Sequence, residues 1–321
     1  MIIEIKEIRF VNVLSILVLL SIIFGIAYYY FGFSYYDFVP LGEVKSNITN
    51  PVYIALYIGD IDGAVSDDWY PFYNQIIDFH EENKIPLTIS FYPATIQDDV
   101  QFNRFMARAY NSKYIELMQK GNTGNETEMR MAELPYEIQY SIIKAGQDHY
   151  RTKMAEILGI NESQVKVPTD YNQIGASFSN ETLKVAESLG FNFYFDIYTG
   201  EDVKSVKPTN TFDVTEYGVS FTTTGEAGNE FPFNTPNKIL KDINSFSRED
   251  LKTIDVNGIP FIPMWAHQQD FENKRKENIL DKRRWEIYTK TVLALQKDPN
   301  VYFITPSEAY ALRHGKLSSV K

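Results

Sequence analysis

Short apolar runs alternate along most of this chain with longer stretches in which apolar residues recur every three or four positions. The short runs are typical of buried strands and the longer stretches of amphipathic helices. The pattern predicts strands at 52–58, 86–92, 114–118, 164–168, 191–197, 259–267 and 301–305, with a further possible strand at 217–223. It predicts helices at 70–83, 100–110, 135–159, 179–190, 237–246, 276–298 and 306–313.

About seven strand–helix alternations favour a single α/β domain built on a parallel sheet. This domain is predicted to span residues 51–314, followed by a short tail at 315–321. A closed or nearly closed barrel suits that length, and an open doubly wound sheet is the alternative. In a barrel, chemistry gathers where the strands end, so residues that follow each predicted strand are the first candidates for a site.

A separate segment, residues 10–33, is apolar and uncharged, and is long enough to cross a bilayer as a helix. We therefore predict an uncleaved transmembrane signal anchor, preceded by a tail at 1–9 and followed by a stalk at 34–50. A cleaved signal peptide is the alternative, because Gly25 and Ala27 could form a weak cleavage site.

The charges around this segment predict its orientation. Lys6 and Arg9 precede it, whereas acidic residues dominate the other side. Basic residues favour the cytoplasmic side, so the N-terminus is expected in the cytoplasm and the main domain outside. We expect the protein to be a single-pass, membrane-anchored protein.

Composition excludes several classes of function. The net charge of −11 and pI near 5.0 disfavour binding to a phosphate backbone, so no nucleic-acid partner is expected. The chain has no cysteine, which excludes thiolate catalysis, disulfides and Cys-ligated zinc. The aromatic content of 15% indicates a large core more readily than a sugar-binding cleft. Four Asn-x-Ser/Thr sequons begin at Asn47, Asn125, Asn161 and Asn180.

The first predicted strand runs into the acidic sequence GDIDGAVSDD, which includes Asp60 and Asp62. Carboxylate oxygens suit a hard cation, although a solvated acidic turn explains the same sequence equally well. The predicted strand at 259–267 ends on His267. Trp265 lies two residues before it, and Asp270 follows three residues later and could orient the imidazole.

Several stretches together resemble one family. They are IALYIGDI, LTISFYP, IELMQKGNTGN, LPYEIQYSIIKAGQ, VPTDYNQIG with NETLKVAESLGF, IPMWAHQQDF and NVYFITPSEAYAL, in that order. In order and spacing they are similar to the polysaccharide deacetylase family, the NodB-homology domain of carbohydrate esterases, and most of all to its divergent archaeal-type members. The resemblance implies a distorted (β/α)7 barrel that removes N-acetyl groups from sugars with a divalent metal, often zinc.

The resemblance also implies where the catalytic groups fall. The paired aspartates of the family match Gly59 and Asp60, or in another register Ile61 and Asp62, so one carboxylate is absent. The two metal-binding histidines match Lys120 and Gly124. The late histidine of the family, which acts as an acid, matches His267.

We therefore expect a deacetylase-like protein without metal-dependent activity that binds or scaffolds surface polysaccharide, with no cofactor. The candidate glycan-binding residues are Asp60, Asp62, Lys120, Asp170, Asp196, Trp265 and His267. The alternative is an active hydrolase of the amide bonds of N-acetylated sugars with a rearranged centre, in which Asp60 or Asp62 is the base and His267 the acid. A divalent metal such as zinc is expected only in this alternative. A third reading is a structural partner of another envelope protein.

Overall fold

The structure is a computed structural model that describes residues 13, 15–23, 41–63, 69–173, 179–195, 213–215, 218–222, 233–246, 255–272 and 280–317. Ten strands are described: β1 (Val52–Ile61), β2 (Leu87–Phe91), β3 (Ile115–Lys120), β4 (Asp170–Asn172), β5 (Phe193–Phe195), β6 (Asp213–Thr215), β7 (Val219–Ser220), β8 (Asp255–Val256), β9 (Ile259–His267) and β10 (Val301–Phe303). The described α-helices of the domain are α3 (Tyr70–Asn83), α4 (Val100–Asn111), α5 (Glu126–Met129), α6 (Tyr136–Leu158), α7 (Asn180–Ser188), α8 (Pro236–Phe246), α9 (Lys282–Gln296) and α10 (Pro306–Arg313).

The strands form one curled sheet in the order β6-β5-β4-β3-β2-β1-β9-β7, with every neighbouring pair on this path parallel. β10 pairs in parallel with the start of β1, and the short β8 runs antiparallel to β9. Within the described residues no pairing joins β6 to β7, so the sheet is an incompletely closed barrel. The predicted barrel-type α/β fold is confirmed, although β6 was not expected from the apolar pattern.

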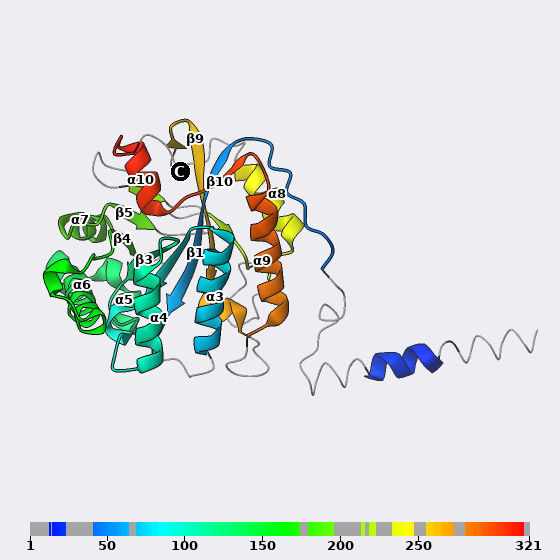
Figure 1. Ribbon diagram of the computed structural model, residues 1–321, viewed down its shortest axis with the longest axis horizontal. Coiled ribbons are helices and arrows are strands. Elements are labelled where there is room, and N and C mark those ends of the chain that lie inside the picture. The colour runs from blue at the N-terminus through cyan, green and yellow to red at the C-terminus, as the bar shows by residue number, and fades with distance from the viewer. Residues whose placement is uncertain are drawn as a thin grey trace, which may run out of the picture.

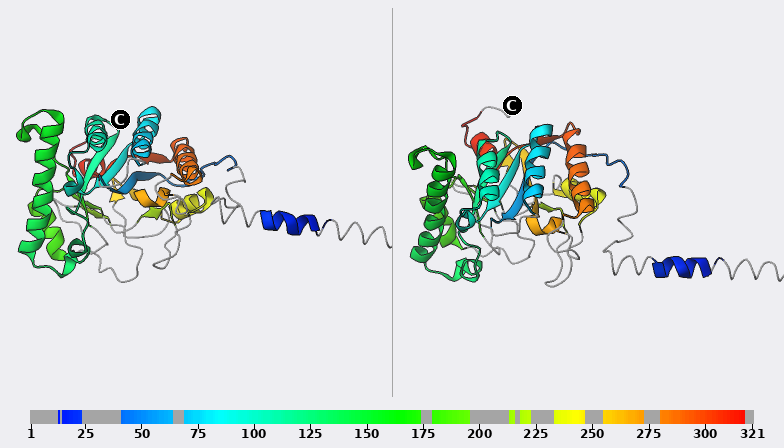
Figure 2. Two further views of the ribbon diagram at one scale, coloured as in Figure 1. Left: turned by 90° about the horizontal axis from the view of Figure 1, so that it is seen from below. Right: turned by 60° about the horizontal axis from the view of Figure 1, so that its bottom comes forward.

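β1 lies at the centre of this sheet and is buried on both faces, which explains its almost continuous apolar sequence. Ile54 and Leu56 belong to the main apolar cluster, whereas Ala55 and Tyr57 pack in a second cluster on the other side. Helices α3, α4 and α9 cover one face of the sheet (Figures 1 and 2). In Figure 1 the central strands point downwards, and α10 lies at the opposite end, above their starts.

Most predicted helices are confirmed because their ends carry clear signals. Gly159 ends α6 in the left-handed conformation (φ 65°), and Ser179 caps α7 by accepting a hydrogen bond from the backbone of Thr182. The helix predicted at 276–298 begins later, at Lys282, where Asp281 accepts hydrogen bonds from two backbone N–H groups.

The strand predicted at 164–168 is wrong. Residues Glu162–Gln164 form a 3-10 turn, and the strand β4 begins only at Asp170. Pro168 lies in the predicted run and has no N–H to give to a sheet, so strand pairing starts after it. This shift of the strand changes the position of Asp170, as described below.

The predicted membrane segment lies largely outside the described residues. Residues 15–23 are helical and exposed. In the part of the chain that the structure describes, no helix has the length and apolar character that crossing a bilayer requires.

Candidate functional site at the carboxyl ends of β1, β3 and β9

Asp60 is placed by an irregularity near the end of β1. The register between β1 and β2 shifts between Ile58 and Ile61, and Asp60 there has a φ of 63°. This left-handed conformation is uncommon for a residue other than glycine, and aspartate is one of the residues that adopt it most readily. Such bulges re-aim a side chain next to functional sites, and here the bulge brings Asp60 among residues from three other segments.

Four side chains surround the Asp60 carboxylate. Lys120, at the end of β3, forms an ion pair with Oδ1, and the Tyr92 hydroxyl donates to the same oxygen at 2.7 Å. Gln269 donates from Nε2 to Oδ2 at 3.0 Å, and Nε2 of His267 lies 3.8 Å from Oδ2. The sequence-predicted residues Asp60, Lys120 and His267 therefore do come together, and both oxygens of Asp60 are engaged.

The ion pair is mostly shielded from water, because the side chains of Lys120 and Asp60 are 7% and 16% exposed. Burial alone would raise the pKa of Asp60, but the charges of Lys120 and His267 outweigh it and hold that pKa well below its ordinary value. Burial alone would lower the pKa of Lys120, but Asp60 outweighs it, and that pKa lies above its ordinary value. Both groups are therefore charged at neutral pH, and Asp60 is a poor general base.

His267 ends β9 directly beside Gly59 of β1. Asp270 accepts a hydrogen bond from the backbone N–H of His267 at 2.7 Å, and the same carboxylate oxygen lies 3.5 Å from Nδ1 of the ring. Trp265 packs against the imidazole with ring centroids 4.8 Å apart. The ring is thus oriented from two sides and remains 29% exposed, so it can reach a ligand.

The loop after β3 is held by a buried carboxylate. The side chain of Glu128 accepts hydrogen bonds from the backbone N–H groups of Asn122 and Thr123, both at 2.8 Å, and from the Thr123 hydroxyl at 2.7 Å. Gly121 and Gly124 have φ values of 50° and 78°, which glycine adopts without strain. Glu128 therefore shapes the segment in which the family resemblance implies two metal-binding histidines.

The position at which the resemblance implies a second carboxylate, Gly59, is closely packed. A Cβ atom at Gly59 would lie 2.8 Å from two atoms of the Tyr57 side chain. The Tyr57 hydroxyl is itself fixed, 2.5 Å from the Ser90 hydroxyl and 3.3 Å from the Asn172 side-chain oxygen. A side chain at position 59 would have to displace this buried ring.

These residues do not fit a catalytic zinc ion. Such a site needs about three protein ligands and an open position for water. Here the one available carboxylate is paired with an ammonium group, and a cation at Lys120 repels a dication. Among the described residues, no three His, Asp or Glu side chains gather in a way that could hold a metal.

The remaining predicted residues have different positions. Asp170 does not join the site: it is the first residue of β4, where it is buried beside Glu116 and Ser307 at the other end of the strands. Asp62 is near the site and is held through its backbone, with its carbonyl accepting from Tyr73 at 3.1 Å. Asp196 lies outside the described residues.

Tyr92, Gln269 and Glu128 contribute to the site but were not predicted. Tyr92 follows β2 directly and ends the strand predicted at 86–92, but it was not singled out as a site residue. Gln269 lies two residues after His267 in a short 3-10 turn. Glu128 lies in the four-residue helix α5, which is too short to produce a periodic pattern.

Comparison with known proteins supports the fold but not a particular activity. No family model and no curated protein matches the sequence. A protein from Mycobacterium smegmatis classed as a polysaccharide deacetylase is similar in structure with a TM-score of 0.51 and 11% identity, over 87% of this chain and 96% of that one. A 4-alpha-glucanotransferase from Thermococcus litoralis also has a TM-score of 0.51 and 11% identity, over 82% of this chain but only 40% of its own. A CE4 family pseudoenzyme from Bacillus anthracis has a TM-score of 0.46 and 10% identity, over 85% of this chain and 70% of that one.

The chain is thus an α/β protein of the barrel class whose polar residues converge at the carboxyl ends of the strands. More particularly, its fold is similar to that of the polysaccharide deacetylase from Mycobacterium smegmatis, so the fold that the sequence resemblance implies is confirmed. One fold hosts many reactions, so the function must be argued from the residues of the site.

Proposed function

We propose that this protein is an outward-facing, membrane-anchored protein of the deacetylase fold that binds surface polysaccharide and does not carry out metal-dependent deacetylation. Residues 10–33 would be the anchor and residues 34–50 the stalk. The observation that carries the proposal is the buried ion pair between Lys120 and Asp60. An ammonium group takes up the carboxylate that a metal would need, and without a metal a water molecule keeps a pKa near 15.7 and is a poor nucleophile.

The surroundings of the ion pair suit a sugar. Trp265 offers an aromatic surface beside the partly exposed ring of His267 and the amide of Gln269. Aromatic side chains with a few fixed polar groups are typical of sites that orient a small polar ligand. In this proposal Lys120 and Asp60 hydrogen-bond sugar hydroxyl groups as a preorganised ion pair without net charge.

The experiment uses the full chain purified in detergent. We expect no stoichiometric zinc by elemental analysis, no acetate release from acetylated chitooligosaccharides, and binding on a glycan array that Trp265→Ala abolishes. Tyr302→Ala is the matched control, because Tyr302 is an aromatic residue that is 45% exposed on β10. Stoichiometric zinc with acetate release would refute the proposal, and an absence of binding to every glycan would favour a structural scaffold instead.

A second function deserves a test because Asp270 orients His267 and leaves its ring partly exposed. A rearranged hydrolase would use His267 as acid and Asp60 or Asp62 as base. It would release acetate, and His267→Ala would abolish that release. The low pKa of Asp60 argues against its role as the base.

A further inference from the structure

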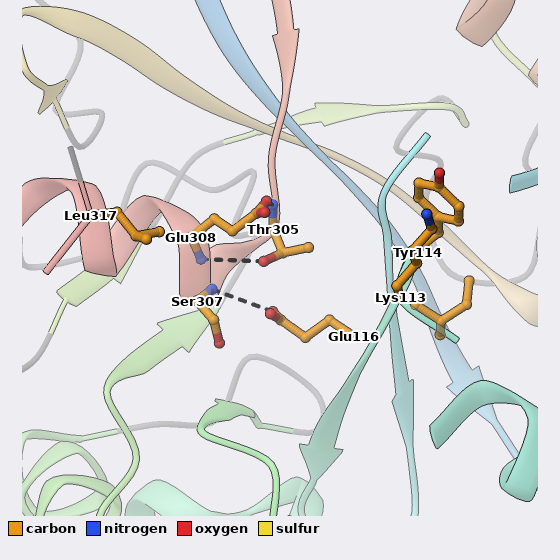
Figure 3. A pocket seen from close by; sticks show the side chains of 8 residues that line it. Lys113, Tyr114, Glu116, Thr305, Ser307, Glu308 and Leu317 are labelled. Carbon is orange, nitrogen blue, oxygen red and sulfur yellow. Dashed lines mark hydrogen bonds between the residues drawn. The ribbon is translucent and has the colours of Figure 1, made fainter. Parts of the chain in front are cut away.

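Two acidic residues, the half-buried Glu116 and the fully buried Asp170, lie at the other end of the sheet, where β3 and β4 begin. Glu116 is the second residue of β3, Asp170 is the first residue of β4, and Ser307 lies in the first turn of α10. Figure 3 shows Glu116 pointing towards Ser307 at a pocket of about 400 Å³. The proposed glycan site does not use any of these residues.

Hydrogen bonds join the acidic pair to α10. The Ser307 hydroxyl donates to Oδ2 of Asp170 at 2.8 Å, and the backbone N–H of Ser307 donates to Oε1 of Glu116 at 3.4 Å. The Thr169 hydroxyl is 2.9 Å from the Ser307 hydroxyl and adds a weaker contact of 3.3 Å to Oδ2. One residue of the helix thus contacts both carboxyl groups.

The second carboxyl oxygen of Asp170, Oδ1, indicates whether this group is ionised or protonated. Asp170 is fully buried, and no described protein donor reaches its Oδ1. Because Ser307 contacts both carboxyl groups, the side chains of Glu116 and Asp170 lie close together. Two ionised carboxylates can only accept hydrogen bonds and repel each other at this separation, so a proton on one of them is favoured.

No cationic side chain forms an ion pair that would neutralise these two carboxyl groups within the described residues. None of the ion pairs of the described residues includes Glu116 or Asp170, and the other charged groups lining the pocket are Lys113 before β3 and Glu308 on α10. Burial first, and then the charge of Asp170, raise the pKa of Glu116 well above its ordinary value. Burial raises the pKa of Asp170 to about 6. At neutral pH the two carboxyl groups together therefore bind one proton.

We propose that Glu116 and Asp170 share one proton, and that this proton latches α10 onto the amino ends of β3 and β4. When the proton leaves at alkaline pH, two negative charges, one of them fully buried, face each other beside Ser307. Like charges in a buried site repel strongly, and water must enter to solvate them. Because Ser307 bridges the pair to α10, the opening that admits water releases the first turn of this helix.

Hydrogen exchange of the α10 amides in the full chain tests the latch. After correction for the intrinsic exchange rate, these data give the equilibrium constant for opening of α10. Between about pH 6 and pH 9 we expect this constant to rise with pH, by up to tenfold for each pH unit above the pKa of the shared proton. Asp170→Asn keeps the shape and can donate to Glu116 without a shared proton, so its opening should depend much less on pH. Glu308→Gln is the matched control: it removes a charge from the same pocket, keeps the capping box with Thr305, and should behave as the wild type.

Three results would overturn the proposal. One is a wild-type opening equilibrium that does not change over this pH range, and another is an unchanged pH dependence in Asp170→Asn. The third is suppression of the alkaline opening by calcium ions, which would make the pair a cation site. If Asp170→Asn does not fold, infrared spectroscopy of the wild type decides, because the latch requires a protonated carboxylic acid at neutral pH that disappears as α10 opens.

Discussion

Replacing Lys120 by methionine tests how strongly the central ion pair stabilises the fold. Methionine keeps an unbranched side chain of similar length but removes the charge. Removing one partner of a buried ion pair typically costs about 3–5 kcal/mol, because the other charge stays buried. Asp60 keeps its hydrogen bonds from Tyr92 and Gln269, so we expect a loss near the lower limit, about 3 kcal/mol.

The pH dependence of this loss has a definite sign. In the folded wild type the pKa of Asp60 lies below its ordinary value, so the ionised carboxylate stabilises the fold. This stabilisation is fully present above the pKa of an unfolded aspartate, about 3.9, and is lost as the pH falls through the lower pKa of the folded protein. Without Lys120, burial dominates and raises this pKa. The Lys120→Met variant is then weakest at neutral pH and recovers part of its deficit as Asp60 takes up a proton.

Urea unfolding of the full chain at about pH 7 and about pH 4.5 measures both effects. Asp60→Asn combined with Lys120→Met should be more stable than Lys120→Met alone, and asparagine also accepts the positive φ at position 60. Lys144→Met is the matched control, because Lys144 pairs with Asp148 on α6 with both side chains more than a third exposed, and it should cost less than about 1 kcal/mol. The reasoning fails if Lys120→Met costs as little as this control, or if its deficit does not shrink at the lower pH.

Three further predictions concern other residues. Glu128→Ala leaves the backbone N–H groups of the loop after β3 without an acceptor, and should lower the free energy of unfolding by about 3 kcal/mol in urea titrations. Gly59→Ala should cost about 1–3 kcal/mol by overpacking, whereas Gly42→Ala, where no atom lies within 4 Å of the new Cβ, should be nearly neutral. Burial lowers the pKa of His80 to about 4, so on acidification the unfolded chain takes up this proton before the folded protein does. The free energy of unfolding of the wild type should therefore fall by up to about 3 kcal/mol between about pH 6.5 and pH 4. His80→Asn should remove this pH dependence of the stability.

The sequence predicts the helices better than the short strands, for a physical reason. An amphipathic helix such as α3 repeats its apolar pattern over several turns, and its predicted bounds match the structure. β4 and β6 have three residues each, which is too few for a pattern to stand out. Such strands form because the neighbouring strands β3 and β5 offer free backbone groups, and this information is not local in the sequence.

The same difference explains the success and failure of the site predictions. Asp60, Lys120 and His267 were placed together because each follows or ends a well-predicted strand of one parallel sheet. Asp170 was placed with them because the strand before it was predicted too early. Once β4 starts at Asp170 instead of ending before it, the residue moves to the opposite end of the sheet.

The two differences from the deacetylase pattern, at positions 59 and 120, together keep the buried charges of the site balanced. In the family, as the resemblance implies, two aspartates face a dication. Here a single carboxylate, Asp60, faces the single positive charge of Lys120. A second carboxylate at position 59 would leave a buried excess of negative charge, and the ring of Tyr57 occupies that space. The ammonium group at Lys120 and the missing carboxylate at position 59 therefore balance each other, and changing only one of them would leave a buried charge without its partner.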